Sequence, residues 1–326
     1  MSPHRRWGEK VKPTKNYQWL CVVAAAVVAL LSFVFIAVAA GPAGDYLMQS
    51  QTLMHDGIKR SYEVRVPKGL DKSGSRVPLV LVLHGGGGNG VNAEAMTGFT
   101  EKAVKEGFVV VYPEGTGRFA GRLLTWNARH CCGRAMEKRV DDVGFINVLL
   151  DRLIRDYPVD PKRVYVTGLS NGGMMTHRLG IALSHRITAI APVIATLFGD
   201  EKKPAHPVSA IMINGMLDQS VPCQGGAPGG RFPNAWDGTK ALPSLAQATF
   251  WTGANGCEAT PDEQDQGAFV VTRYPCPAGK DVAFYLVKDN GHAWPGGKSG
   301  TRRGDKPSSS IHATDVIWEF FKDRKK

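Results

Sequence analysis

The chain has 326 residues, of which 43% are hydrophobic, and this suits one large domain with a substantial core. Its net charge is +11, but the basic residues are spread thinly and form no stripe with interleaved aromatic residues. Composition therefore argues against a nucleic-acid partner, and the excess positive charge is expected on a solvated face.

The first 40 residues read as a targeting segment. An uncharged apolar run, Trp19–Ala40, follows a positively charged leader and closes with the small residues Ala37-Val-Ala39-Ala40. This pattern predicts a signal peptide that is cleaved after about Ala39. The run is also long enough to span a bilayer, so an uncleaved anchor is the alternative. In both cases residues 41–326 are expected to form a single secreted or periplasmic domain, with membrane contact only through residues 19–40.

Export implies an oxidising compartment, in which cysteines pair. Five cysteines lie outside the apolar run, so they cannot all pair within one chain. Cys257 and Cys276 bracket a short loop and a strand, and they are expected to bond to each other. Cys223 is expected to pair with Cys131 or Cys132, and a bond between Cys131 and Cys132 is the alternative. No cysteine or histidine pair has zinc-site spacing, so no metal is expected.

Beyond the leader, strand patterns alternate with helix patterns. Alternating or continuous apolar runs predict strands at 61–66, 79–83, 108–112, 164–167, 187–190, 210–213, 268–274 and 282–287. Helical spacing predicts helices at 93–106, 141–157, 174–183, 242–251 and 311–322. This alternation is typical of an α/β fold with a mostly parallel central sheet and helices on both faces.

The strand at 164–167 leads into Gly168-Leu-Ser170-Asn-Gly172, a G-x-S-x-G pentapeptide that precedes a helix. In this position the pentapeptide is typical of a nucleophile elbow. Its glycines permit a tight turn, and the serine is held exposed on a strained backbone. An incidental serine at a plain strand–turn–helix corner is the alternative. The chain must therefore also supply a base, an acid and an oxyanion hole.

In an α/β-hydrolase the acid and then the histidine follow the serine along the chain, each at the carboxyl end of a strand. His292 lies in a glycine-rich loop after the strand 282–287 and is the predicted base, whereas His312 is expected to begin the last helix. Asp218 follows the strand 210–213 and is predicted to orient the imidazole, with Asp200 as the reserve candidate.

An oxyanion hole needs backbone N–H donors, and two are predicted. One belongs to Asn171, the residue after the serine. The other belongs to Gly86 in the loop His84-Gly-Gly-Gly-Gly88, where His84 itself is expected to bond the loop backbone. Trp126 and Trp294 are predicted to contact the substrate, with core packing as the alternative for both.

Asp141 and Asp142 stand at the start of a predicted helix. We expect them to cap this helix and to match its dipole. A carboxylate pair for glycoside hydrolysis would have to be separated across a sugar cleft, which two adjacent acids do not suggest.

Several motifs occur in a fixed order along the chain. They are Leu83-His-Gly-Gly-Gly-Gly88, Trp126-Asn127 with Cys131-Cys132, Val140-Asp-Asp-Val-Gly-Phe145, Val166-Thr-Gly-Leu-Ser-Asn-Gly-Gly-Met174 and Gly291-His-Ala-Trp-Pro-Gly296. Over roughly residues 50–325 the chain resembles the secreted polyhydroxybutyrate depolymerase and feruloyl esterase group, related to carbohydrate esterase family 1. The resemblance implies an α/β-hydrolase fold and a serine carboxylesterase that uses no metal or other cofactor, with Ser170, Asp218 and His292 as its triad.

We therefore predict ester hydrolysis through an acyl-enzyme on Ser170. The substrate is expected to be a small or polymeric ester of the polyhydroxybutyrate, feruloyl or acetyl type, and the protein is expected to be a monomer. A non-catalytic envelope protein on the same scaffold and a serine peptidase of the same fold are the alternatives.

Overall fold

The computed structural model describes residues 45–70, 74–229, 233–300 and 304–326. These residues belong to one compact unit, Ala40–Lys326. The predicted signal peptide or anchor at residues 1–40 lies outside the described residues. Within the described ranges, no helix is both long enough and apolar enough to cross a membrane.

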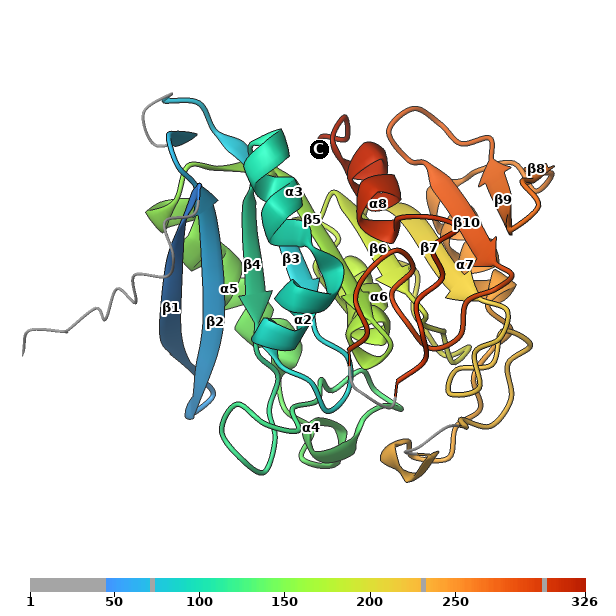
Figure 1. The fold of residues 1–326 in the computed structure, drawn as a ribbon, viewed down its shortest axis with the longest axis horizontal. Coiled ribbons are helices and arrows are strands. Elements are labelled where there is room, and N and C mark those ends of the chain that lie inside the picture. Colours follow the sequence, from blue (N-terminus) through green and yellow to red (C-terminus); the bar gives the residue numbers. More distant parts are fainter. Residues whose placement is uncertain (1–44, 71–73, 230–232, 301–303) are drawn as a thin grey trace, which may run out of the picture. The chain divides into compact units, whose positions relative to one another are not determined.

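A ten-stranded mixed sheet runs through this unit in the order β1-β2-β4-β3-β5-β6-β7-β10-β9-β8 (Figure 1). The strands are β1 Tyr46–His55, β2 Ile58–Pro67, β3 Val77–Leu83, β4 Val109–Pro113, β5 Val159–Leu169, β6 Ala189–Val193, β7 Ser209–Gly215, β8 Asp262–Asp265, β9 Phe269–Tyr274 and β10 Val282–Val287. Every pairing from β4 to β10 is parallel, as predicted for the centre of the sheet. The strands at the two edges join antiparallel.

Helices cover both faces of the sheet, as predicted. They are α2 Gly90–Thr97, α3 Phe99–Glu106, α4 Gly133–Glu137, α5 Asp142–Asp156, α6 Asn171–Ala182, α7 Leu245–Asn255 and α8 Ala313–Phe321, with a short 3-10 helix η2 Pro233–Ala235. Alternate side chains of β3 divide between two cores because successive residues of a strand point to opposite faces. Leu79 and Leu81 pack in the core that includes residues of α5, α6 and α7, whereas Val80 and Val82 pack with α2, α3 and α8.

Several elements differ from the sequence-based expectation, among them the following three. The predicted helix 93–106 is two helices, because Gly98 takes a left-handed φ of 67° that ends α2 and begins α3. Helix α6 begins directly after Ser170 rather than at residue 174. Strand β1 was not predicted, since its residues are mostly half-buried or exposed and carry little apolar alternation.

The cysteine predictions are confirmed in one case and wrong in another. Cys257 and Cys276 form the predicted disulfide. Cys131 bonds to its neighbour Cys132, which was the alternative. The predicted pairing of Cys223 with one of them is therefore wrong, because both sulfurs already have a partner, and Cys223 is a free thiol.

The carboxyl ends of the parallel strands meet at one edge of the sheet, where the arrowheads of β4, β7 and β10 point in Figure 1. The loops that follow these strands therefore converge there. The predicted serine, acid, histidine and glycine-rich loop all lie in such loops, after β5, β7, β10 and β3 respectively.

Candidate active site

Ser170 occupies the turn between β5 and α6 with a strained backbone, at φ 56° and ψ −121°. The turn is crowded on both sides. A Cβ atom on Gly168 would lie 2.6 Å from the backbone of Gly172, and one on Gly172 would lie 2.5 Å from the carbonyl oxygens of Leu83 and His84. Only glycine fits at these two positions, so the pentapeptide has the geometry of a nucleophile elbow.

Ser170, His292 and Asp218 form a continuous hydrogen-bonded chain. The Ser170 Oγ lies 2.9 Å from the Nε2 of His292, and the Nδ1 of the same ring lies 2.8 Å from the Oδ2 of Asp218. A carboxylate accepts only, so Nδ1 carries the proton and Nε2 is left to accept the serine hydroxyl proton. The structure thus brings together the three residues of the predicted triad.

Residues outside the triad hold Asp218 and His292 in place. The Asp218 side chain is only 1% exposed, and its Oδ1 accepts the backbone N–H groups of Ser220 and Val221 at 2.7 and 2.9 Å. The backbone N–H of His292 donates to Asp305 at 2.6 Å. The imidazole is 23% exposed, so it can meet a ligand from solvent.

The two predicted oxyanion donors are neighbours. A Cβ atom on Gly86 would lie 3.5 Å from the Cβ of Asn171, so the two backbone segments run side by side. Within the described ranges, neither N–H has a hydrogen-bond acceptor in the protein. The N–H of Asn171 is also the first of helix α6, whose dipole favours negative charge at that end. Both groups could therefore donate to an anionic oxygen beside Ser170.

The side chain of Asn171 is clamped by two hydrogen bonds to the backbone of Trp126. Its Oδ1 accepts the Trp126 backbone N–H at 2.7 Å, and its Nδ2 donates to the Trp126 carbonyl oxygen at 3.0 Å. The Sγ of Cys131 lies 3.6 Å from the same Nδ2. The carboxyl-side neighbour of the serine thus has a fixed orientation.

Comparison with known proteins identifies the family. Residues 60–223 match the sequence profile of the family described as Esterase PHB depolymerase. The chain belongs to this family. The match spans the glycine-rich loop, the disulfide pair, the elbow and Asp218, but ends before His292.

Curated relatives agree with this placement. The chain is 28% identical over 250 residues to feruloyl esterase B of Piromyces equi, covering 74% of this chain but only 44% of that protein, so it spans less than half of this relative's length. It is 26% identical over 268 residues to feruloyl esterase C of Emericella nidulans, covering 80% of this chain and 83% of that one.

A solved structure shows the fold. The acetyl xylan esterase from Aspergillus awamori superposes with a TM-score of 0.58 at 16% identity, covering 84% of this chain and 98% of that one. Together with the sheet order and the helix layers, this confirms the predicted α/β-hydrolase fold.

In this esterase-family chain, His84 is a structural residue, as expected from the sequence. Its Nδ1 lies 2.8 Å from the carbonyl oxygen of Gly85, and its Nε2 accepts the N–H of Gly115 at 3.0 Å. Burial lowers the pKa of His84 to about 4, so the ring is neutral and braces the oxyanion loop without competing as a base.

Core packing, the alternative for Trp126 and Trp294, accounts for the positions of both rings. Trp126 is fully buried and donates its indole N–H to the carbonyl oxygen of His84 at 3.1 Å. Trp294 is 1% exposed, packs edge-on against Phe99 and donates to Thr314 at 3.1 Å. Each indole N–H is thus bonded within the protein, and each ring is buried.

Sequence reasoning did not identify an aromatic pair that lies next to Cys131. Phe198 and Trp236 are half-buried and meet edge to face with ring centroids 5.5 Å apart. Trp236 forms a β-bridge with Cys131, the residue whose sulfur contacts Asn171. The pair could not be found from local pattern, because it joins two irregular loops that are distant in sequence.

The other candidates take different roles. Asp200, the reserve acid, pairs with Arg129 and with His130 at 3.1 Å instead of with His292. His312 occupies the cap position of α8, as expected. Among the described residues, no group of three or more His, Cys, Asp or Glu is placed to hold a metal ion.

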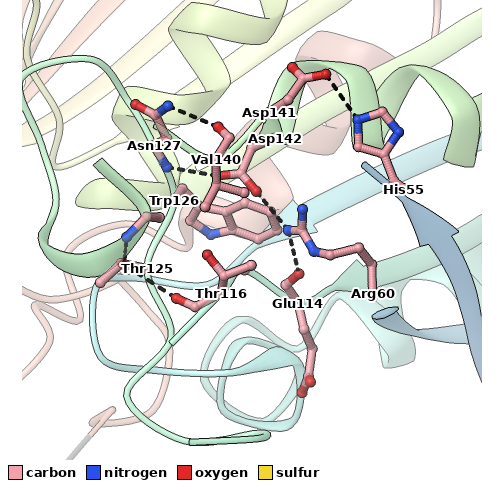
Figure 2. A network of polar contacts seen from close by, with 12 residues as sticks. His55, Arg60, Glu114, Thr116, Thr125, Trp126, Asn127, Val140, Asp141 and Asp142 are labelled. Atoms are coloured by element: carbon pink, nitrogen blue, oxygen red, sulfur yellow. Dashed lines mark hydrogen bonds and ion pairs between the residues drawn. The ribbon is translucent and has the colours of Figure 1, made fainter. Parts of the chain in front are cut away.

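The two acids before α5 have separate roles. Asp141 caps the helix by accepting the N–H of Gly144 at 2.9 Å, and this bond lowers the pKa of its carboxyl. Asp142 is fully buried and pairs with Arg60, as Figure 2 shows. Burial raises the pKa of the Asp142 carboxyl and lowers the pKa of the Arg60 guanidinium, while the ion pair opposes both shifts. The capping prediction is therefore confirmed for Asp141. Asp142 does not cap the helix but lies in its first turn, as dipole matching predicts.

Proposed function

We propose that the chain is a serine carboxylesterase that works through an acyl-enzyme on Ser170. The observation that carries the proposal is the hydrogen-bonded chain from the Ser170 Oγ to His292 at 2.9 Å and on to Asp218 at 2.8 Å. Its members come from three separate strand ends, in the sequence order that the fold requires. The family membership of the chain also supports ester hydrolysis.

In the first half of the reaction, His292 takes the Ser170 proton at Nε2 while Oγ attacks the ester carbonyl carbon. The carbonyl π electrons move to oxygen, and the N–H groups of Asn171 and Gly86 stabilise the negative charge. When the intermediate collapses, the carbon–oxygen bond to the alcohol breaks, and the leaving alcohol takes the proton from His292. Asp218 stays ionised and stabilises the imidazolium between these transfers.

In the second half, water replaces the alcohol. His292 removes a proton from this water, the hydroxyl oxygen attacks the acyl carbon, and the same donors hold the second oxyanion. Breaking the bond to Oγ returns the proton to Ser170 and releases the carboxylic acid. No group other than the triad and the two backbone donors is needed for either half.

We infer the substrate class from the aromatic pair Phe198–Trp236 near Cys131, here called the aromatic wall. Phe198 and Trp236 present a half-buried aromatic surface next to the Cys131–Asn171 contact. Aromatic rings favour offset-stacked or edge-to-face contacts with another aromatic ring, such as that of a feruloyl group. Feruloyl esters therefore fit better than acetyl or hydroxybutyrate esters, and two relatives are named feruloyl esterases.

The test is hydrolysis of p-nitrophenyl acetate and of methyl ferulate by the wild type and by Ser170→Ala. The proposal expects turnover of both esters by the wild type and almost none by the variant. Equal rates in the two proteins would overturn it in favour of a non-catalytic protein. Faster cleavage of aminoacyl amides than of matched esters would instead indicate a peptidase.

We also propose that residues 41–326 act as one exported catalytic domain. The two disulfides, Cys131–Cys132 and Cys257–Cys276, suit an oxidising compartment. Mass spectrometry of the exported protein tests this and also decides between cleavage after about Ala39 and an intact anchor.

A further inference from the structure

The adjacent acids at the start of α5 face opposite environments. The Asp141 side chain is 51% exposed and contacts His55 at 2.9 Å. The Asp142 side chain is 0% exposed, and its partner Arg60 is 1% exposed. Helix capping needs only one of these carboxylates, so the buried charge of Asp142 requires another explanation.

Both oxygens of Asp142 are used, and they join different parts of the fold. Its Oδ1 accepts the Nη2 of Arg60 at 2.6 Å, and its Oδ2 accepts the backbone N–H of Asn127 at 2.7 Å. Arg60 is itself held in place. Its Nη2 also donates to the carbonyl oxygen of Glu114 at 3.0 Å, and its guanidinium lies 3.9 Å from the ring centroid of Phe145. Figure 2 shows this arrangement, with Asn127 and Arg60 on either side of the Asp142 carboxyl.

Asp142 holds the segment Trp126–Asn127, and this segment in turn holds the side chain of Asn171. Asn127 follows Trp126, whose backbone exchanges two hydrogen bonds with the Asn171 side chain, at 2.7 and 3.0 Å. Asn127 is fixed on its other side as well, because its Nδ2 donates to the carbonyl oxygen of Val140 at 2.8 Å. Its own carbonyl oxygen accepts from Arg178 of α6, the helix that begins at Asn171.

We propose that Asp142, with Arg60 as its counter-ion, is a positioning residue for the oxyanion hole. It fixes the backbone at Trp126 and Asn127, which in turn fixes Asn171 and the N–H that Asn171 offers to the oxyanion. This inference rests on the proposed ester hydrolysis. Neither Asp142 nor Arg60 touches the reacting atoms, so their effect is on the donor's placement alone.

The consequence is kinetic. Negative charge develops on the carbonyl oxygen only as the transition state forms. A displaced donor therefore reduces the stabilisation of the transition state more than it reduces binding of the ester. Removing a whole oxyanion donor lowers kcat by roughly 100- to 1,000-fold. A donor that is present but loosely held should cost less, about 10- to 100-fold in kcat, with little change in KM.

The first test replaces the whole pair in the double variant Arg60→Met and Asp142→Leu. Removing only one partner would leave a lone buried charge and strongly destabilise the chain, whereas an apolar pair of similar volume is compatible with folding. The Asn127 N–H then has no carboxylate to bond. We expect a folded protein by circular dichroism, with kcat on p-nitrophenyl acetate lowered about 10- to 100-fold and KM within about twofold of the wild type.

Asp141→Ala is the matched control. It removes the neighbouring carboxylate and the helix cap, so it should lower Tm while leaving kcat unchanged. A folded double variant with wild-type kcat would overturn the inference, and so would an Asp141→Ala variant with the same loss of kcat.

Asn171→Ala provides the second, independent measurement. It keeps the backbone N–H but removes the clamped side chain, so it should lower kcat by a similar factor. The triple variant combines Arg60→Met, Asp142→Leu and Asn171→Ala. Because all three changes act through one contact, it should lose no more kcat than the worse of the double variant and Asn171→Ala. If the losses of kcat in the two parent variants multiply in the triple variant, the inference is overturned. An undiminished kcat in Asn171→Ala would also overturn it, and this can be measured even if the double variant does not fold. Absence of Ser170-dependent turnover in the wild type would instead reject the proposed function.

Discussion

The sulfur of Cys131 lies 3.6 Å from the Nδ2 of Asn171, so one end of the Cys131–Cys132 disulfide rests against the clamped side chain next to Ser170. The other disulfide, Cys257–Cys276, links residues beyond α7 to the end of β9, away from this contact. The two bridges therefore have different expected effects on activity and stability.

Replacing Cys131 and Cys132 together by serine should lower kcat several-fold with a small loss of stability, because the bond closes no long loop. Replacing Cys257 and Cys276 by serine should leave kcat unchanged and lower the free energy of unfolding by about 3 kcal/mol, since that bridge closes a loop of 19 residues. Steady-state kinetics and urea unfolding of both variants measure the contrast. Equal kcat in the two variants would contradict it.

Asp218→Asn tests the assignment of the acid. The amide keeps the size of the side chain but no longer stabilises the imidazolium and can turn its N–H group toward the ring, so kcat should fall about 10⁴-fold at similar KM. Asp200→Asn is the matched control because Asp200 pairs with Arg129 and His130 at the surface. Its kcat should match the wild type, and a large loss there would favour the reserve assignment.

The placement of the triad could be predicted from sequence because each member follows a strand with a clear apolar pattern. The convergence of the strand ends then follows from general rules of α/β folds. Gly168 and Gly172 could likewise be recognised because their role is local, in the tight turn around Ser170.

Features that depend on contacts between distant irregular segments could not be predicted. The Arg60–Asp142 pair joins β2 to α5, and neither residue has a periodic neighbourhood that reveals burial. Trp294 stands two residues from His292 in sequence, yet its ring packs against Phe99 in the core that includes residues of α2, α3 and α8. Adjacency to a site residue in sequence thus did not give the direction of the side chain.

Trp236→Ala tests the aromatic wall. Loss of this ring should raise KM for methyl ferulate, lowering kcat/KM about fivefold, because one aromatic contact contributes about 1 kcal/mol. The kcat/KM for p-nitrophenyl acetate should change little, since an acetyl group is too small to need the wall. The ratio of the two constants is the measurement, and an unchanged ratio would contradict the assignment.

Trp294→Ala is the counterpart in the core. Its ring is 1% exposed, so the variant should lose about 3–5 kcal/mol of unfolding free energy. The ester preference of the protein that remains folded should be that of the wild type. Urea unfolding and the same two substrates separate this outcome from the one expected for Trp236→Ala.

Two buried neutral histidines predict a loss of stability in acid. His177 lies 2.6 Å from Gln247 through Nε2 and accepts the Trp251 indole N–H at 3.0 Å, and burial lowers its pKa to about 4. Burial lowers the pKa of His84 to about 4 as well. In the unfolded chain the pKa of each imidazole is about 6.5. Between these values the unfolded state binds more protons, so the free energy of unfolding decreases as the pH falls.

Each histidine should therefore contribute up to about 3 kcal/mol that is present above pH ~6.5 and lost by pH ~4. Urea unfolding of the wild type at intervals from pH 7.5 to 4.5 measures the combined slope. His177→Gln removes one of the two titrations, so its curve should be flatter over the same range whatever its stability at pH 7.5. A variant slope as steep as that of the wild type would show that His177 is not the buried neutral group that the structure places there.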